Sequence, residues 1–339
     1  MGQKTYTVGI IGATGVVGQR MRQVLEERKF PVGTLRLYST ARSAGKKISF
    51  SGVEHDVQEL TADSFKGLDL ALFSAGTDAS RDHCWRAAAA GALVVDNSNA
   101  WRMDPRVPLV VPEVNPGALK NHAGLIANPN CSTIQMVVAL WPLHQKAHLE
   151  RIVVSTYQSV SGTGIDAMNE LDAQVKAEAN GLPAVPPQIY PKTIAFNCLP
   201  HIDSFDADGN TLEEMKMVRE TRKIFDYPEL AVSATCVRVP VRISHSESVN
   251  AQFRDALTPD QARRILAEAP GVIVVDDPAR GLYPLPRDAE GRDEVFVGRI
   301  RRDTSHPRAL NLWVVSDNVR KGAATNAVQI AEQVFGLTP

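Results

Sequence analysis

GATGVVG at residues 12–18 lies directly after an apolar, strand-like segment at 6–11 and opens a segment with helical periodicity at 15–27. A glycine turn between a strand and a helix is typical of dinucleotide-binding folds, in which the helix N-terminus receives the pyrophosphate. The first glycine permits a tight turn, the second a close approach of backbone to phosphate, and the third close packing of the helix. The spacing G-x-x-G-x-x-G is less specific than G-x-G-x-x-G, so a bare glycine turn is the alternative. The residues expected to contact a dinucleotide at this turn are Gly12, Thr14, Gly15, Val16 and Val17.

Outward from this turn, short apolar runs alternate with helical stretches as far as residue 128, which indicates βαβ units on a parallel sheet. The second helical stretch has a capping candidate in Thr77 or Asp78 and is expected to end at Gly91. The expected strands are 6–11, 35–38, 69–73, 92–95 and 124–127, and the expected helices are 15–27 and 79–90.

The pattern changes after NPNCST at 128–133. An apolar helix is expected to run through Trp141, with Pro142 as its stop or kink. Longer segments with partial period-two alternation follow, which predicts a mixed or antiparallel sheet with one covered face. The expected strands are 151–160, 232–243, 248–257, 294–303 and 309–317, the expected helices are 164–179, 213–225 and 259–268, and 181–191 is expected to be an irregular proline-rich loop.

The chain is therefore predicted to be an α/β protein, with an N-terminal doubly wound (Rossmann-type) parallel sheet and a second α+β domain with a mixed sheet. We expect residues 1–130 to form the first domain, completed by a C-terminal helix in 318–339, and residues 131–317 to form the second. The last helical segment, at 322–336, is expected to pack back on the first domain.

The composition is that of an ordinary globular protein, with 339 residues, 37 Lys plus Arg against 38 Asp plus Glu, and a formal net charge of -1. This balance argues against disorder and against nucleic-acid binding. The four cysteines lie far apart in the sequence without a C-x-x-C pair, so neither disulfides nor a metal site is expected. The longest apolar run, at 87–95, is too short for a membrane helix, and we find no signal peptide, so a cytoplasmic location is expected.

Cys131 is the most distinctive candidate for chemistry, because it follows Asn128-Pro129-Asn130 and stands at the start of the expected apolar helix. A helix N-terminus stabilises a thiolate, and its unpaired N–H groups can bind an oxyanion. The alternative for any cysteine is a small buried apolar residue. We expect that alternative for Cys84, Cys198 and Cys236.

His245, Arg238 and Gln158 are weaker candidates from the residues alone. Alternation over 232–243 would place Arg238 on one strand face and His245 just beyond the strand, where it could serve Cys131 as a proton-transfer partner. Gln158 and the turn at 161–164 end the first long strand of the second domain and could face a substrate.

The residues after the second expected strand favour NADP over NAD. An NAD-selective fold places an acidic residue about 20 residues after the glycine turn, but no acid occurs here between Glu27 and Glu54. The segment STARS at 39–43 and two lysines at 46–47 supply hydroxyls and positive charge instead. Ser39, Arg42 and Ser43 are thus expected to bind the 2′-phosphate, unless the segment is simply a solvated basic loop.

Taken together, six ordered motifs resemble the aspartate-semialdehyde dehydrogenase family over essentially the whole chain. The motifs are GATGVVG at 12–18, NSNAWRMDPRVPLVVPEVN at 97–115, NPNCST at 128–133, STYQSVSGTG at 155–164, EEMKMVRET at 213–221 and CVRVPVRISHS at 236–246. The resemblance implies a reversible, phosphate-dependent and NADP-dependent oxidation of aspartate semialdehyde to 4-aspartyl phosphate, in the biosynthesis of lysine, threonine, methionine and isoleucine.

The resemblance also implies a role for each matching residue. It implies that Cys131 is the acylated nucleophile, His245 the acid–base histidine and Gln158 the glutamine that orients the substrate. It implies that Arg238 binds the substrate α-carboxylate and that Glu213 lies near the α-amino group. The phosphate site would comprise Arg102, Lys216 and Asn130, and further cofactor contacts would come from Ser161, Gly162 and Asn318. Without the resemblance, Glu213 and Lys216 are more typical of a solvated helix face.

The family further implies a homodimer whose contact is supplied by the second-domain sheet and its long insertion, with small molecules as the other partners. Three alternatives stay open from the sequence. N-acetyl-glutamyl-phosphate reductase normally has an NPGCY-like motif where this chain has NPNCS, and the SCTTN-like surround of glyceraldehyde-3-phosphate dehydrogenase is absent. A non-catalytic NADP-binding regulator would not need Cys131, Gln158, Arg238 and His245 together.

Overall fold

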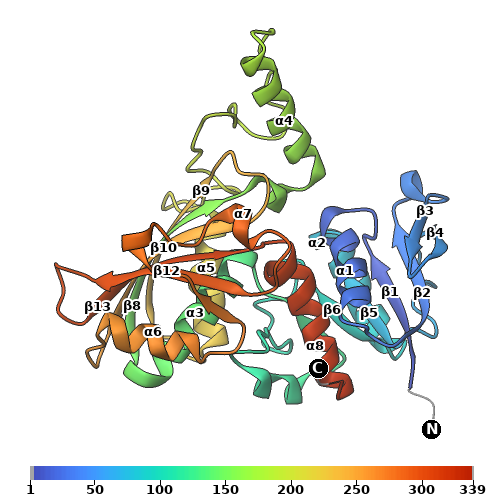
Figure 1. Cartoon of the computed structure of the whole chain (residues 1–339). Coiled ribbons are helices and arrows are strands. Elements are labelled where there is room, and N and C mark those ends of the chain that lie inside the picture. Colours follow the sequence, from blue (N-terminus) through green and yellow to red (C-terminus); the bar gives the residue numbers. More distant parts are fainter. Residues whose placement is uncertain (1–3, 338–339) are drawn as a thin grey trace. The chain divides into compact units, whose positions relative to one another are not determined.

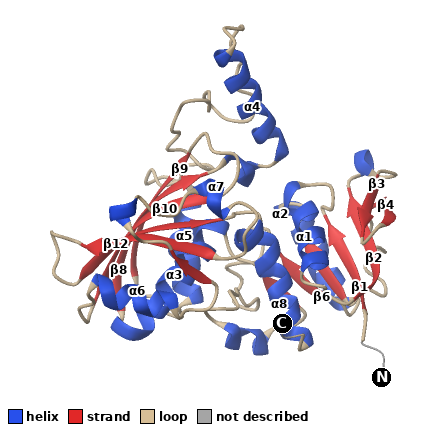
Figure 2. Ribbon diagram, viewed as in Figure 1, coloured by secondary structure: helices blue, strands red, loops and turns tan. Residues whose placement is uncertain are grey.

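The computed structural model describes residues 4–337 and divides the chain into two compact units. One unit comprises the chain up to Asn130 together with the segment from Ala323 onward, and the other comprises Cys131–Gly322 (Figure 1). Residues 1–3 and 338–339, which the expected domain bounds include, lie outside the described residues. Each unit has its own sheet (Figure 2).

The first unit contains a seven-stranded sheet in the order β3-β4-β2-β1-β5-β6-β7. All neighbouring strands run parallel except β3 and β4, which form an antiparallel pair at one edge. The strands are β1 (Tyr6–Ile11), β2 (Val32–Ser39), β3 (Lys47–Phe50), β4 (Val53–Glu59), β5 (Leu70–Phe73), β6 (Leu93–Asp96) and β7 (Leu125–Ala127), and the helices are α1 (Val16–Glu27), α2 (Thr77–Ala89) and α8 (Thr325–Phe335). The doubly wound parallel sheet is therefore confirmed.

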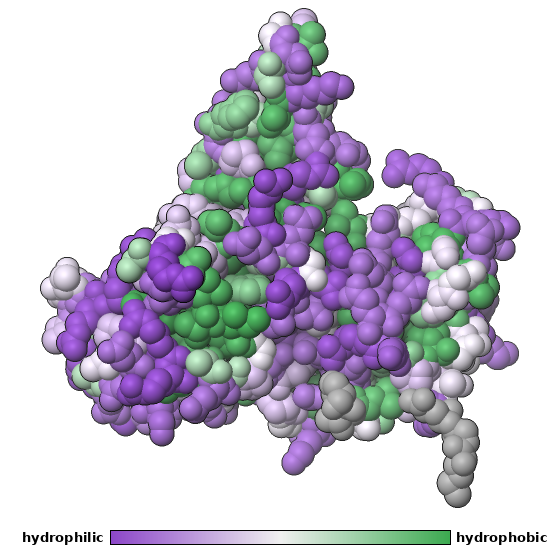
Figure 3. Space-filling model, viewed as in Figure 1, coloured by the Kyte–Doolittle hydropathy of each residue, from purple (hydrophilic) through white to green (hydrophobic). Residues whose placement is uncertain are grey.

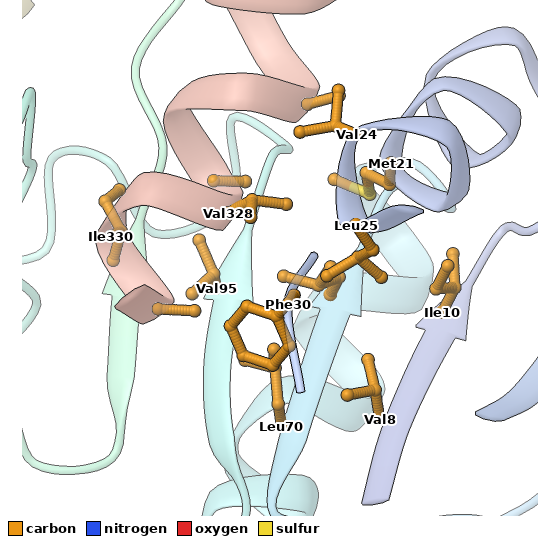
Figure 4. Close-up of a cluster of buried hydrophobic side chains, with 14 of the residues drawn as sticks. Val8, Ile10, Met21, Val24, Leu25, Phe30, Leu70, Val95, Val328 and Ile330 are labelled. Carbon is orange, nitrogen blue, oxygen red and sulfur yellow. The ribbon is translucent and has the colours of Figure 1, made fainter. Parts of the chain in front are cut away.

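Helices α1 and α8 pack against each other and cover an apolar face of this sheet (Figure 4). Val8 and Ile10 lie two residues apart on β1, so both face the same side of the sheet. They form one hydrophobic cluster with Met21 and Leu25 of α1 and Val328 of α8. The rings of Tyr6 and Phe335 stack with centroids 4.3 Å apart. The last helix thus returns to the N-terminal sheet, as the sequence predicts, because its apolar stripe completes this core.

The second unit contains a six-stranded mixed sheet in the order β11-β12-β13-β10-β8-β9. The pairs β11–β12 and β8–β9 are parallel, and the other neighbours are antiparallel. The strands are β8 (Leu149–Gln158), β9 (Ala231–Arg238), β10 (His245–Phe253), β11 (Val272–Val274), β12 (Val295–Arg302) and β13 (Ala309–Ser316). The expected mixed sheet is confirmed.

Helices α3 (Cys131–Ala147), α5 (Leu212–Ile224) and α6 (Pro259–Ala267) pack against this sheet and against one another. Helix α3 is apolar nearly all round, with eleven buried residues, which is the pattern of a helix enclosed by its own unit. Helix α4 (Ile165–Ala179) and an irregular chain to Thr211 form an insertion between β8 and α5. A four-residue helix, α7 (Pro286–Ala289), precedes β12.

Three expectations about local structure were wrong. Helix α3 continues through Pro142 to Ala147, so Pro142 does not end it. Strand β9 ends at Arg238, and His245 is the first residue of the next strand, β10, instead of lying just beyond the strand that contains Arg238. Helix α2 is preceded by Gly76 without a side-chain cap. A π-helical turn, Arg320–Ala324, precedes α8. The hairpin of β3 and β4 and the short strand β11 were not expected from the sequence.

Candidate active site

The glycine turn of the first unit is built as its sequence predicts. Gly12 has a φ of 85°, and a Cβ atom there would lie 2.3 Å from the carbonyl oxygen of Ser74. A Cβ on Gly18 would lie 2.2 Å from the carbonyl oxygen of Gly12, so α1 packs on the turn only without a side chain. A Cβ on Gly15 would lie 3.4 Å from the carbonyl oxygen of Gly12, which is an ordinary van der Waals contact. Packing within the protein therefore does not require this glycine, and its open side is available to a ligand.

A cavity of about 500 Å³ lies beside this turn, within the first unit. The hydroxyls of Thr14 and Ser39 are 2.9 Å apart at its edge and join the turn to the end of β2. The first turn of α1 contains no acidic residue, so the positive end of the helix dipole is unopposed. The other residues that line the cavity are Ile11, Gly12, Gly15, Thr40, Ala41, Glu59, Leu60, Ser74, Ala75 and Ala79. Volume, backbone donors and helix dipole all fit a dinucleotide phosphate.

The three residues expected to bind the 2′-phosphate differ in their exposure and in whether they line the cavity. Ser39 lines the cavity, Arg42 is exposed on a short 3-10 turn (Ala41–Ser43), and Ser43 is only 6% exposed. Glu59, at the end of β4, also lines the cavity and pairs in register with Ser39. Sequence reasoning missed this carboxylate because it looked for an acid close to the glycine turn, whereas Glu59 comes from a later strand.

Arg102 is a buried arginine of the first unit, with 6% of its surface exposed. Its Nε donates to the carbonyl oxygen of Asn128 at 2.9 Å, and one Nη donates to that of Asn97 at 3.0 Å. The Asn128 side chain is held in turn by Asn326 of α8, whose Nδ2 is 2.7 Å from its Oδ1. Helix α8 therefore fixes the segment that leads to Asn130.

Cys131 begins α3 in the second unit and is partly exposed. Gly322, in the π-helical turn, lies against it, because a Cβ on Gly322 would be 2.9 Å from the Cβ of Cys131. The absence of a side chain at Gly322 thus leaves room for the thiol. The start of a long helix is a position that favours a thiolate.

Gln158, Glu213 and Lys216 form a connected polar row. Gln158 ends β8 and donates from Nε2 to Glu213 Oε1 at 3.1 Å, and Lys216 Nζ donates to Glu213 Oε2 at 3.0 Å. Lys216 also donates to Asp203 at 2.9 Å. Burial alone lowers the pKa of Lys216, but the carboxylates of Glu213 and Asp203 outweigh burial and raise it. Glu213 is buried, so this part of α5 is not the solvated face that its sequence suggested.

His245 is completely buried at the start of β10. The backbone N–H of Ser159 donates to its Nδ1 at 2.9 Å, and the Ser159 hydroxyl lies 3.0 Å from the same nitrogen. Asn318 Oδ1 accepts hydrogen bonds from the hydroxyls of Ser159 and Ser161 and from the N–H of Ser244. Because Nδ1 accepts a backbone hydrogen bond, the neutral ring carries its proton on Nε2. Burial, and then the charge of Arg238, lower the pKa of His245 to about 3.

Arg238 ends β9 and donates from Nη1 to the Ser159 carbonyl oxygen at 2.7 Å. Its guanidinium carbon lies 6.0 Å from the centroid of the Tyr190 ring, and Tyr190 donates to the Thr163 hydroxyl at 3.0 Å. A Cβ on Gly162 would lie 3.0 Å from Arg238 Nη1 and 3.4 Å from His245. The 159–163 turn is thus packed directly on both side chains.

The structure therefore brings together most of the expected second-unit residues and divides the expected phosphate site between the units. Gln158, Glu213 and Lys216 are linked, and Gly162 lies beside Arg238 and His245, whereas Arg102 and Asn130 belong to the first unit. Sequence reasoning missed Ser159, Tyr190 and Gly322. Ser159 lies in the STYQSVSGTG motif, but nothing in that pattern shows that its backbone N–H contacts a histidine. Tyr190 and Gly322 lie outside the quoted motifs.

The cysteine expectations were correct for two of three residues. Cys84 and Cys236 are buried, and burial raises the pKa of each thiol. Cys198 is exposed, so the expectation that it is buried was wrong. Among residues 4–337 no group of His, Cys, Asp and Glu could hold a metal ion, and no helix there is long and apolar enough to span a membrane.

The fold and the site define a class of dehydrogenase in which a dinucleotide-binding unit is joined to a unit that carries a cysteine at a helix start. Family models agree: residues 7–122 match the NAD-binding domain of semialdehyde dehydrogenases, and residues 140–321 match their dimerisation domain.

Individual relatives match this chain over nearly its whole length. Aspartate-semialdehyde dehydrogenase of Aquifex aeolicus is 56% identical over 330 residues, covering 96% of this chain and 97% of that protein. The structure of aspartate semialdehyde dehydrogenase II from Vibrio cholerae, complexed with ASA, matches with a TM-score of 0.96 and 47% identity over 98% of this chain and 99% of the other. The Candida albicans enzyme with NADP matches with a TM-score of 0.76 and 27% identity over 98% and 99% of the two chains. The chain belongs to the aspartate-semialdehyde dehydrogenase family, whose members are NAD(P)-dependent oxidoreductases of aspartate-family amino-acid biosynthesis.

Proposed function

We propose that this protein interconverts aspartate semialdehyde and 4-aspartyl phosphate, with NADP and inorganic phosphate, through a thioester on Cys131. The observation that carries the proposal is the placement of Cys131 at the start of α3 in the unit that also holds Gln158, Arg238 and His245. In the oxidative direction the thiolate adds to the aldehyde carbon and forms a thiohemiacetal. Loss of hydride gives the thioester, and a phosphate oxygen then attacks the acyl carbon and releases Cys131.

His245 handles the proton in this scheme. With Nδ1 bonded to Ser159, its Nε2 is the reactive nitrogen, and Nε2 has no other hydrogen-bond partner among the described residues. Nε2–H can donate to the oxygen of the thiohemiacetal as it forms. For Nε2 to act as a base, the neutral ring must carry its proton on Nδ1 instead, where the Ser159 hydroxyl at 3.0 Å can accept a hydrogen bond from it. The low pKa of His245 keeps the free enzyme's ring neutral at physiological pH.

Positively charged side chains bind the two anionic groups in this scheme, the α-carboxylate of the substrate and inorganic phosphate. We assign Arg238 to the α-carboxylate, since a planar guanidinium bonds a carboxylate with two parallel hydrogen bonds. Glu213 and Gln158 lie together as the partners of the α-amino group and the reacting end of the substrate. Arg102, Lys216 and Asn130 form the proposed phosphate site.

We propose NADP as the nicotinamide cofactor, which accepts or supplies the hydride when bound. Gly12, Thr14, Gly15, Val16 and Val17 would hold its pyrophosphate, Ser39, Arg42 and Ser43 its 2′-phosphate, and Ser161, Gly162 and Asn318 its nicotinamide end. The cavity beside the glycine turn and the open side of Gly15 support this assignment. Glu59 in the same cavity weighs against it, so the cofactor experiment below includes that residue.

The two units divide this work: residues 1–130 with the C-terminal helix bind the cofactor, and residues 131–317 carry the chemistry and form a homodimer. Exposed Tyr283 and Leu285 border a hollow with Trp313, and Trp313 packs on the half-exposed Tyr157 ring at 5.3 Å. Hydrophobic residues gather at the surface over β12, β13 and α4 (Figure 3). An apolar face of this kind is typical of a subunit contact.

The experiment that tests the reaction is NADPH formation by the purified protein. We expect turnover with aspartate semialdehyde that requires phosphate, and far less with N-acetylglutamate semialdehyde. A preference for the N-acetylated substrate would favour the reductase alternative, and no turnover with either would favour a non-catalytic regulator.

A further inference from the structure

A buried carboxyl group lies beneath the proposed catalytic residues and has no part in the scheme above. Glu247 is completely buried in β10, two residues after His245. Residues two apart on a strand share one face, so both side chains lie on the face that α3 covers. Across the sheet Glu247 pairs with Thr156 of β8 and with Val314 of β13.

Gln135 connects this carboxyl group to the nucleophile helix. It is completely buried in α3 and stands four residues after Cys131, which places it one helical turn further along the same face. Its Nε2 donates to the backbone carbonyl oxygen of His245 at 3.4 Å. The Gln135 amide also acts on the Glu247 carboxyl, whose charged form it favours. One side chain of α3 thus reaches both His245 and Glu247.

The hydrogen-bond partners of Gln135 and Glu247 indicate whether the Glu247 carboxyl group is ionised or neutral. Both carboxyl oxygens of Glu247 and the amide oxygen of Gln135 are buried and have no hydrogen-bond partner among the described residues. An ionised carboxylate would bury an uncompensated charge together with two unpaired acceptors, whereas a carboxylic acid is neutral and brings a donor of its own. Burial raises the pKa of Glu247 well above its usual value, and the Gln135 amide opposes this only in part.

We propose that Glu247 is a positioning residue that works as a neutral acid: its O–H donates to Gln135 and holds the first turns of α3 on β10, which fixes Cys131 relative to His245. This role rests on the proposed function, in which those two residues act on one substrate. The thiol of Cys236 on β9 senses the charge of Glu247, and His245 lies two residues away on the same strand. No positively charged group offsets the effect of burial on the pKa of Glu247.

Four variants test the role. Glu247→Gln keeps the size and a donor, so it should retain the wild-type kcat and KM within about twofold. Glu247→Leu removes the donor, and Gln135→Leu removes its partner. Since a displacement of about 1 Å can cost about 100-fold in rate, each should lower kcat by about tenfold to 100-fold with little change in KM. Thr221→Val, which removes a buried and unpartnered hydroxyl from α5, is the matched control and should leave kcat unchanged.

Alkylation of Cys131 by iodoacetamide in the free protein is the second measurement, because it needs no substrate. We expect slower alkylation in Glu247→Leu and Gln135→Leu than in the wild type, Glu247→Gln and Thr221→Val. If Glu247→Gln is as impaired as Glu247→Leu, or if both leucine variants keep the wild-type kcat and alkylation rate, the proposal is wrong. If the wild type does not oxidise aspartate semialdehyde but the alkylation differences are found, the proposed function fails while the positioning role stands.

Discussion

The two units build their sites in different ways. The cavity of the first unit is formed by backbone and small side chains around one turn, at the carboxyl ends of parallel strands. The site of the second unit is formed by charged and polar side chains that β8, β9, β10 and α5 bring together in a buried network. The first arrangement accommodates a cofactor of fixed shape, whereas the second controls charge and proton position. Substitutions in the first unit should therefore affect the binding of cofactor or phosphate, and substitutions in the second unit should affect substrate binding or rate.

The largest effect is expected at Cys131. Cys131→Ala should reduce kcat by about 10⁴-fold or more, because the covalent step has no substitute, while NADP binding by the first unit stays within about twofold. Steady-state kinetics and cofactor titration measure the two effects. Cys198→Ala, at an exposed cysteine, is the control and should be fully active. Substantial residual turnover in Cys131→Ala would break the assignment of chemistry to the second unit.

The next largest effects are expected at the buried arginines Arg238 and Arg102, one in each unit. Arg238→Leu should raise the KM for aspartate semialdehyde by about 100-fold, since hydrogen bonds to a charged group are lost. Arg102→Leu should raise the KM for phosphate by a similar factor and change that for the semialdehyde much less. Indistinguishable kinetic profiles for the two variants would contradict separate anion sites.

A smaller effect is expected at the cofactor cavity. Arg42→Ala should raise the KM for NADP by about tenfold and leave the KM for NAD nearly unchanged, because only NADP carries a 2′-phosphate. Glu59→Gln should lower the KM for NADP, since it removes a carboxylate from the cavity. Kinetics with both cofactors decide the matter. Equal losses with NADP and NAD in Arg42→Ala, or a wild-type preference for NAD, would refute the proposed 2′-phosphate site.

The smallest effect is a pH dependence of stability caused by Glu247. Its pKa is raised in the folded protein, so above about pH 4.3, where the unfolded chain ionises, the folded state keeps a proton that the unfolded state loses. The free energy of unfolding should therefore fall as pH rises toward the folded pKa. Glu247→Gln cannot ionise at this position, so its free energy of unfolding relative to that of the wild type should be higher at pH 8 than at pH 4. Urea titrations at the two pH values measure this difference, and parallel curves would contradict a neutral Glu247.

The difference between the two units also explains why the sequence predicted the glycine turn of the first unit better than the side-chain network of the second. GATGVVG acts within one turn, so its strand, helix and cavity followed from local pattern. The residues that surround Ser159 and His245 come from positions 162, 238 and 318, and no periodicity connects them. Only the family resemblance grouped most of them. Ser159 was missed because it acts largely through its backbone, and burial of Glu213 was hidden because its helix has the charge pattern of a surface.

The thioester on Cys131 is tested most directly by a single turnover without phosphate. Protein in excess of aspartate semialdehyde is mixed with NADP, and NADPH and the mass of the Cys131 peptide are followed. We expect a burst of about one NADPH per semialdehyde with an aspartyl adduct on Cys131, which is stable until phosphate releases it, and no burst in Cys131→Ala. A burst without an adduct, or the same burst in Cys131→Ala, would contradict the mechanism.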